Sequence, residues 1–183
     1  GRSQSIAFGA PPALSVGATA SVSATASSGL AVSFATLTPG VCSVQPAGAV
    51  TGVGAGTCTV SADQPGNATW AAAPRATLDL AVRQATQTLA FGTAPALTVG
   101  ASATVRASAS SGLAVTYASL STGICTVDGS SGRVDALAIG TCTVAANQAG
   151  NATWAAAPQA TQSIAVAGRS QAVTFGSAPA LAV

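Results

Sequence analysis

The four cysteines are the residues of this chain best suited to covalent chemistry. They form two groups, Cys42 with Cys58 and Cys125 with Cys142, whose members lie 16 and 17 residues apart. A zinc site would need closely spaced cysteine pairs and often histidine, and the sequence offers neither. Their matched positions in the two halves of the chain favour one disulfide within each group over the other two connectivities and over free thiols.

Two such disulfides bear on stability and on location. Closing a loop of about 15 residues contributes roughly 3 kcal/mol in the chain-entropy treatment, a large share of the stability of a small domain. Persistent disulfides are typical of proteins outside the cytoplasm. We therefore expect this chain to be extracellular or displayed at a cell surface.

The carboxylates do not form a pattern suited to catalysis or to metal binding. Asp63 with Asp79 and Asp128 with Asp135 are the only pairs within one half of the chain. Because the sequence has no histidine and no lysine, a nucleophile would have no base to activate it. The segment from Asp128 to Gly132 has too few carboxylates for a calcium cage, and a turn is the preferred interpretation. The sequence predicts a protein that is not an enzyme and has no cofactor and no metal.

The two tryptophans are the residues most open to a binding role. Trp70 and Trp154 stand in identical surroundings, Gly-Asn-Ala-Thr-Trp-Ala-Ala-Ala-Pro. An aromatic ring on a loop can stack on a sugar or anchor a partner. The preferred alternative is that each ring caps the open end of a domain. Asn67 and Asn151 fit the N-glycosylation pattern, although a residue of a turn explains each of them as well.

Charge is scarce along the whole chain. Only 5% of the residues are charged and the formal net charge is +2, against roughly a quarter of residues in ordinary soluble domains. Six scattered arginines form no basic stripe, so nucleic acid is not an expected partner. Apolar runs are short and interrupted by serine, threonine and glycine, so no membrane span is expected.

The chain is built from repeats. The segment 66–74 returns letter for letter as 150–158, 84 positions later, and 27–32 returns as 110–115, 83 positions later. A third copy opens at Gly168-Arg-Ser-Gln, matching the first four residues. We expect domains at 1–83 and 84–167, with 168–183 as the first strand of a further repeat in a longer array.

Within each repeat the apolar residues alternate with polar ones. Residues 18–26 place alanine and valine on one face and serine and threonine on the other, and 101–109 repeat this pattern with Arg106 on the polar face. Similar alternation runs through 30–34, 57–62 and 78–82. The one difference in length between the repeats falls between the cysteines of each pair, which locates a hairpin end at 45–48 and 128–132. About seven short strands per repeat predict an all-β fold of tandem antiparallel sandwiches.

Three strings carry a resemblance to a known family. They are Val-Cys-Ser-Val at 41–44, Val-Thr-Gly-Val-Gly-Ala-Gly-Thr-Cys-Thr-Val at 50–60, and the tryptophan segment at 66–74. Together they resemble the bacterial immunoglobulin-like (Big-type) tandem repeats of large secreted or surface-displayed proteins, and the resemblance covers essentially the whole chain. It implies immunoglobulin-like sandwiches that serve as stalks, spacers or adhesin segments.

These observations lead to one expected function and one alternative function. We expect a structural segment of an extracellular fibre, stalk or filament at a bacterial surface. Its partners would be neighbouring repeats of the same chain, with self-association into a filament as a further possibility. The alternative is an adhesin module that binds surface glycans or a receptor through the loops of Trp70 and Trp154. The short, glycine-free connection at 83–88 predicts restricted bending between repeats.

Overall fold

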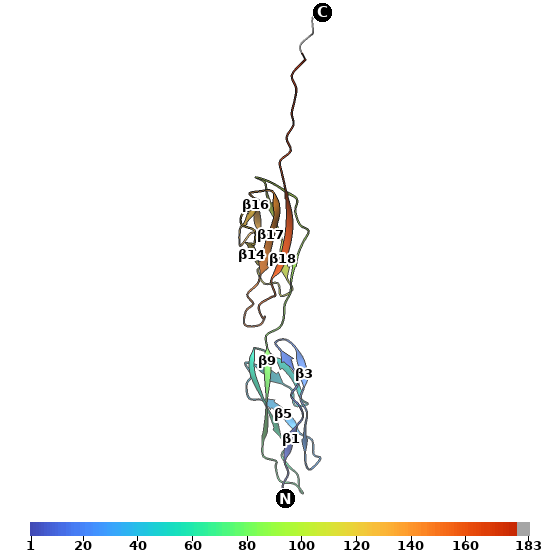
Figure 1. The fold of residues 1–183 in the computed structure, drawn as a ribbon. Coiled ribbons are helices and arrows are strands. Elements are labelled where there is room, and N and C mark those ends of the chain that lie inside the picture. Colours follow the sequence, from blue (N-terminus) through green and yellow to red (C-terminus); the bar gives the residue numbers. More distant parts are fainter. Residues whose placement is uncertain (179–183) are drawn as a thin grey trace, which may run out of the picture. The chain divides into compact units, whose positions relative to one another are not determined.

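The structure, a computed structural model, describes residues 1–178 and is all-β, with no helix among them (Figure 1). The last five residues of the strand predicted at 168–183 lie outside the described residues. The chain divides into two compact units, Gly1–Gln87 with Ala149–Ala157, and Thr88–Gln148 with Pro158–Val183. No helix in the described part of the chain is long and apolar enough to cross a membrane.

The first unit contains three sheets. A four-stranded sheet has the order β2-β9-β8-β5, a three-stranded sheet the order β3-β7-β6, and a two-stranded sheet pairs β1 with β4. The strands are β1 (Ile6–Phe8), β2 (Leu14–Ser15), β3 (Thr19–Ser21), β4 (Ala24–Ala26), β5 (Ser33–Thr36), β6 (Cys42–Val44), β7 (Ala49–Gly52), β8 (Gly56–Asp63) and β9 (Ala76–Arg83).

The second unit has the same strand orders. They are β11-β18-β17-β14, β12-β16-β15 and β10-β13. The strands are β10 (Leu89–Phe91), β11 (Leu97–Thr98), β12 (Ser102–Thr104), β13 (Ala107–Ala109), β14 (Thr116–Ser119), β15 (Cys125–Val127), β16 (Arg133–Ala136), β17 (Gly140–Asn147) and β18 (Ala160–Ala167).

Apolar residues from the facing sheets form one core in each unit. In the first, the core is centred on Val50, Val60 and Leu80, and in the second on Val134, Val144 and Ile164, all of them at most 1% exposed. Phe34 packs on Phe8 with ring centroids 6.0 Å apart, and Tyr117 packs on Phe91 at 6.3 Å. The predicted all-β sandwich fold is therefore confirmed. The predicted domain boundaries, which rest on the repeat alone, stay a prediction.

The structure differs from the sequence prediction in how the strands pair. The alternating segment 18–26 is not one strand, because β3 pairs with β7 while β4 pairs with β1. Val22 between them is buried and its N–H donates to the carbonyl of Gly48, which turns the chain from one sheet to the next. The alternation of faces was right, since it does not depend on the partner strand.

Two strand pairs in the structure are parallel. β2 pairs with β9, and β11 pairs with β18, over two residues each. All other strand pairs of residues 1–178 are antiparallel. Each parallel pair joins an early strand of a repeat to its last strand, so the repeat is closed between its two ends.

The predicted hairpin ends are confirmed. β6 and β7 are joined at Gly48, whose N–H donates to the carbonyl of Gln45. Gly48 has a φ of +97°, and a Cβ there would lie 2.5 Å from the carbonyl oxygen of Val22. Glycine is therefore required at this turn.

Candidate functional site

The structure joins Cys42 to Cys58 and Cys125 to Cys142, the two pairs that the sequence predicts. Each bond links the start of one sheet's hairpin to a strand of the opposite sheet, β6 to β8 and β15 to β17. All four cysteines are 0% exposed. Because attack on a disulfide requires access of a thiolate to sulfur, burial protects both bonds in the folded chain.

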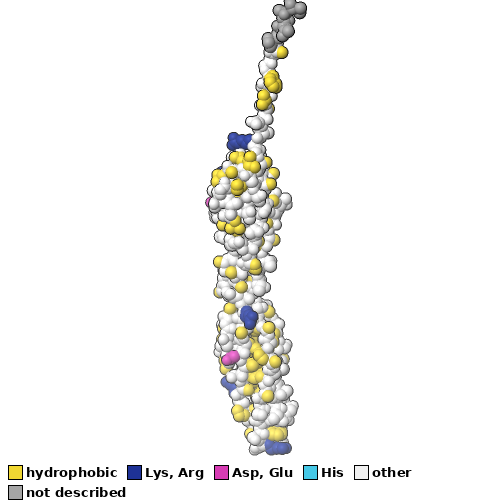
Figure 2. Space-filling model, in the orientation of Figure 1, with side chains coloured by type: hydrophobic (Ala, Val, Ile, Leu, Met, Phe, Trp, Pro, Cys, Tyr) yellow, Lys and Arg dark blue, Asp and Glu magenta, His cyan; other side chains and the backbone are white. Residues whose placement is uncertain are grey.

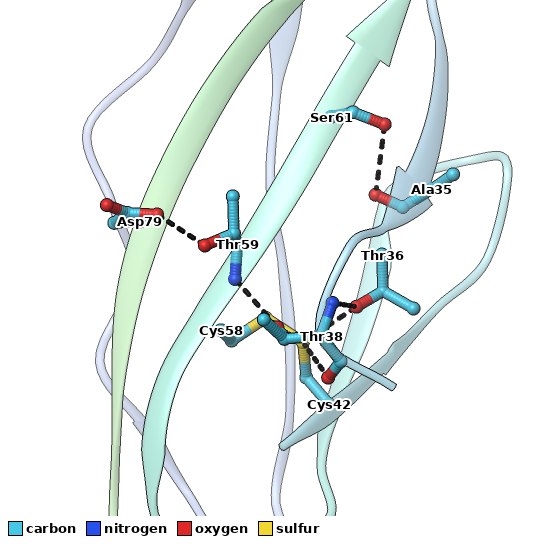
Figure 3. Close-up of a disulfide and its surroundings, with 8 residues drawn as sticks. All are labelled: Ala35, Thr36, Thr38, Cys42, Cys58, Thr59, Ser61 and Asp79. Atoms are coloured by element: carbon cyan, nitrogen blue, oxygen red, sulfur yellow. Dashed lines mark hydrogen bonds between the residues drawn. A yellow bond between two sulfur atoms is a disulfide. The ribbon is translucent and has the colours of Figure 1, made fainter. Parts of the chain in front are cut away.

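Two hydroxyl groups lie beside the sulfur atom of Cys42 (Figure 3). The hydroxyl of Thr36 lies 3.2 Å from the sulfur of Cys42, and that of Thr38 lies 3.6 Å from it. The Thr38 oxygen also accepts a 2.9 Å hydrogen bond from the N–H of Thr59 on β8. Thr38 thus ties the loop after β5 to the strand that carries Cys58.

The second repeat keeps this arrangement with serine in place of threonine. The hydroxyls of Ser119 and Ser121 lie 3.4 Å and 3.6 Å from the sulfur of Cys125. Ser121 accepts a 2.8 Å hydrogen bond from the N–H of Thr143. The shared feature of both repeats is therefore a buried crosslink with hydroxyls beside it, which holds two sheets together.

The tryptophan loops lie beside the first residues of each repeat. Asn67 forms a turn in which its side-chain oxygen accepts hydrogen bonds from the N–H groups of Thr69 and Trp70, at 2.8 Å and 2.9 Å. This geometry supports the interpretation of Asn67 as a turn residue. Asn151 accepts the same bonds from Thr153 and Trp154, both at 2.9 Å.

Trp70 is half-buried, and one face of its ring is occupied. The guanidinium carbon of Arg2 lies 4.7 Å from the ring centroid, a cation–π contact. Trp154 is also half-buried, but Ala85 stands where the first repeat has Arg2. Within the described residues no guanidinium group covers the ring of Trp154.

The sequence interpretation overlooked a buried pair of glutamines. Gln4 and Gln64 are 7% and 6% exposed, and the amide of Gln4 donates to the side-chain oxygen of Gln64 and to the carbonyl of Ala71, both at 2.7 Å. Ser28 donates to the side-chain oxygen of Gln4. This cluster fastens the first residues of the repeat to the tryptophan loop. A glutamine at the same place in each copy, 4, 87 and 171, was the available signal.

The same fastening begins immediately after the first repeat. β9 ends at Arg83, and Ala85 already exchanges two hydrogen bonds of 2.8 Å with the loop at Thr153 and Ala155. Gln87, 3% exposed, donates to the carbonyl of Ala155 at 2.7 Å. Of the six residues that the sequence suggested as a connection, only Gln84 separates β9 from Ala85.

The acidic residues serve turns and ion pairs. Hydrogen bonds from the backbone and hydroxyl of Ser131, and then from those of Ser130, hold the pKa of Asp128 far below its usual range. A hydrogen bond from Ser102, with Arg133 nearby, lowers the pKa of Asp135. Asp63 pairs with Arg75 at 2.8 Å. Among residues 1–178 no group of three metal-ligating side chains comes together.

Ser61 does not lie on the exposed face where the alternation over 57–62 places it. Ser61 was expected on the exposed face of its strand, but it is 1% exposed. It lies on the central strand β8, between β5 and β9, and its hydroxyl donates to the carbonyl of Ala35 at 3.4 Å. A small side chain there is covered by its neighbours on both sides.

Comparison with known proteins gives fold-level similarity alone. No protein-family model matches the chain, and no curated protein sequence is similar to it. Among solved structures it is similar to the surface layer protein SbsC, domains 1-6, with 18% identity and a TM-score of 0.37, over 92% of this chain and 28% of that chain.

Two further solved structures are similar over most of this chain. Human protocadherin-24 EC1-2 has 15% identity and a TM-score of 0.38, over 90% of this chain and 98% of that chain. The C-terminal 282-residue fragment of intimin, solved with the intimin-binding domain of the translocated intimin receptor, has 20% identity and a TM-score of 0.37, over 90% of this chain and 51% of that chain. Similarity at this level assigns neither a family nor a function.

Proposed function

We propose that this chain is a structural segment of an extracellular fibre, stalk or filament at a bacterial surface, built from immunoglobulin-like repeats. The observation that carries the proposal is the pair of fully buried disulfides, one at the same place in each repeat. Each disulfide links the two sheets of its sandwich, and such bonds persist outside the reducing cytoplasm.

The hydrogen bonds at the start of each repeat add to the proposal. Gln4 and Gln87 are both buried and both bond to a carbonyl of a tryptophan loop. Gln84, the first residue after β9, donates to the carbonyl of Asn151 at 2.6 Å, and Ala85 bonds to the same loop, so the hydrogen bonds to the loop begin directly after β9. A segment that transmits force along a chain of domains needs short connections of this kind.

The surface composition agrees with a structural role. Charged side chains are few on the face shown in Figure 2, and most of that face is neither basic nor acidic. Such a surface offers no large field to steer a charged substrate or nucleic acid.

The test uses native material from the organism that makes the protein. We expect antibodies against residues 1–178 to label intact cells or shed fibres, and mass spectrometry of the labelled protein to find all four cysteines oxidised in the pairs described above. Recovery of the protein from the cytoplasm with four reduced thiols would contradict the proposal.

A second candidate function is adhesion through Trp154. The observation in its favour is that, within residues 1–178, no guanidinium group lies over this ring, whereas Arg2 covers Trp70. Binding on a glycan array that Trp154→Ala abolishes and Trp70→Ala leaves intact would support adhesion. If neither variant binds less, and Trp70→Ala and Trp154→Ala both melt at lower temperature, the rings stabilise the fold alone.

A further inference from the structure

The first unit carries a groove on the outer face of β9, lined by residues from Pro11 to Thr86. The groove has a volume of about 730 Å³, within the range of roughly 300 to 1,000 Å³ that is usual for small-molecule sites. Pro11, Pro12 and Ala81 supply apolar surface, and Ser15, Gln84 and Thr86 supply hydroxyl and amide groups.

Two charged residues line this groove, in a chain that has ten charged residues in all, six basic and four acidic. Asp79 and Arg83 both face outward from β9 and flank Ala81. Four residues of a strand place them about 13 Å apart. The second repeat has Ser163 and Ala167 at the corresponding positions, so the charges belong to the first repeat and are not required by the fold.

Each of these two charged side chains can form a further hydrogen bond to a ligand. Within residues 1–178 the guanidinium group of Arg83 makes no ion pair and no hydrogen bond; its backbone carbonyl alone is used, by the N–H of Val16. One oxygen of Asp79 accepts a 2.7 Å hydrogen bond from the hydroxyl of Thr59, which leaves its second oxygen for another donor. A free guanidinium group in a groove suits a carboxylate, which it can bind with two parallel hydrogen bonds.

At the Arg83 end of the groove, the strand edges exclude a peptide that binds by strand addition. Val82 of β9 is paired on both sides, with Leu14 of β2 and with Gly56 of β8, and Arg83 is paired with Ser15 of β2. β2 is two residues long, and the chain directly after it is bridged at Val16 to Gly52. Because a peptide strand needs a row of unpaired backbone groups, a compact polar ligand fits this groove better.

We propose that this groove binds an acidic saccharide. The carboxylate of the sugar lies at Arg83, its hydroxyl groups donate to the free oxygen of Asp79, and the apolar face of a ring rests on Pro11, Pro12 and Ala81. This site is separate from Trp70 and Trp154, and it adds ligand recognition to the structural role proposed above.

The test is a titration of the whole chain followed by NMR of its backbone amides, with sialyllactose as the acidic probe and lactose as the neutral one. We expect sialyllactose to shift amides at Ser15, Ala81 and Arg83 and lactose to leave them unchanged. Arg83→Gln should weaken binding about tenfold or more, the loss of a charge-assisted hydrogen bond. Arg106→Gln, which removes an exposed charge from the second repeat, is the matched control and should bind as the unmodified chain does.

Several results would overturn the proposal. They are no response of the groove amides, an equal response to lactose, an equal response to a short aspartate-containing peptide, or unchanged binding by Arg83→Gln with its melting temperature preserved. None of these results bears on the disulfides or on cell-surface labelling, so the structural role stands or falls separately.

Discussion

Removing one disulfide should destabilise the repeat that contains it and leave the other repeat unchanged. The perturbation is Cys42→Ala together with Cys58→Ala, which opens a crosslink across 16 residues. The chain-entropy treatment gives a loss of about 3 kcal/mol for a loop of this length. A domain of this size has about 4 to 12 kcal/mol in total, so the loss is a large fraction of its stability.

The assay is equilibrium unfolding in urea or by heat. For a domain of 60 to 100 residues, a loss of about 3 kcal/mol lowers the melting temperature by roughly 12 to 24 °C. The matched variant, Cys125→Ala with Cys142→Ala, opens a crosslink across 17 residues and should destabilise the second repeat by the same amount. Each variant should therefore shift one of two transitions.

Reducing the disulfides of the unmodified chain distinguishes the stability that the crosslinks give from the stability that packing of the cysteine side chains gives. The reduced chain keeps all four sulfur atoms in the core but has no crosslink, so it should lose most of the same stability. If the reduced and oxidised chains unfold within about 1 kcal/mol of each other, the crosslinks do not stabilise these repeats in the way the chain-entropy argument requires.

Three further perturbations test separate parts of the fold. Gln4→Ala removes the donor to two buried acceptors and should cost about 1 to 3 kcal/mol in urea unfolding; a neutral result would mean that water replaces it. Gly48→Ala should cost about 2 kcal/mol because of its positive φ and the close carbonyl, whereas Gly40→Ala, with open space around it, should change stability by less than about 0.5 kcal/mol. Folding lowers the pKa of Asp128, so the ionised carboxylate stabilises the folded chain above the ordinary aspartate pKa of about 4, and this stabilisation is lost as the pH falls below that value. Asp128→Ala should therefore reduce the loss of stability on acidification. An unchanged dependence of the unfolding free energy on pH would contradict this role of Asp128.

The sequence predicted the features of the fold that repeat at short range. Alternation over 18–26, and over 57–62 with the exception of Ser61, gave the buried faces, because a strand turns successive side chains to opposite sides whatever its partner is. The length difference between repeats gave the hairpin ends at 45–48 and 128–132, because exposed loop tips tolerate insertion.

Features that depend on distant partners were not predicted. The separation of β3 from β4 follows from a hydrogen bond between Val22 and Gly48, and the parallel pairing of β2 with β9 joins residues far apart in sequence. The bond between Gln4 and Gln64 spans 60 positions. No local pattern marks such pairs, because the two partners lie far apart in the sequence.

Of the candidate sites, the disulfides could be predicted from the sequence and the groove at Arg83 could not. Matched positions of cysteines in two repeats identified both disulfides before any geometry was known. The groove at Arg83 could not be predicted from the sequence. Pro11 and Ala81, which both line it, are far apart in the chain and come together because β2 pairs with β9. The roles of Trp70 and Trp154 stay predictions.

Single-molecule stretching of the chain from its first residue to residue 178 tests the structural role most directly. If the repeats are crosslinked load-bearing domains, two unfolding steps appear, and reduction lengthens each by roughly 50 Å, the extended length of the 16 or 17 closed residues less the 5.6 or 5.7 Å between the bonded Cα atoms. Extension without distinct steps, or steps of the same length before and after reduction, would contradict this account.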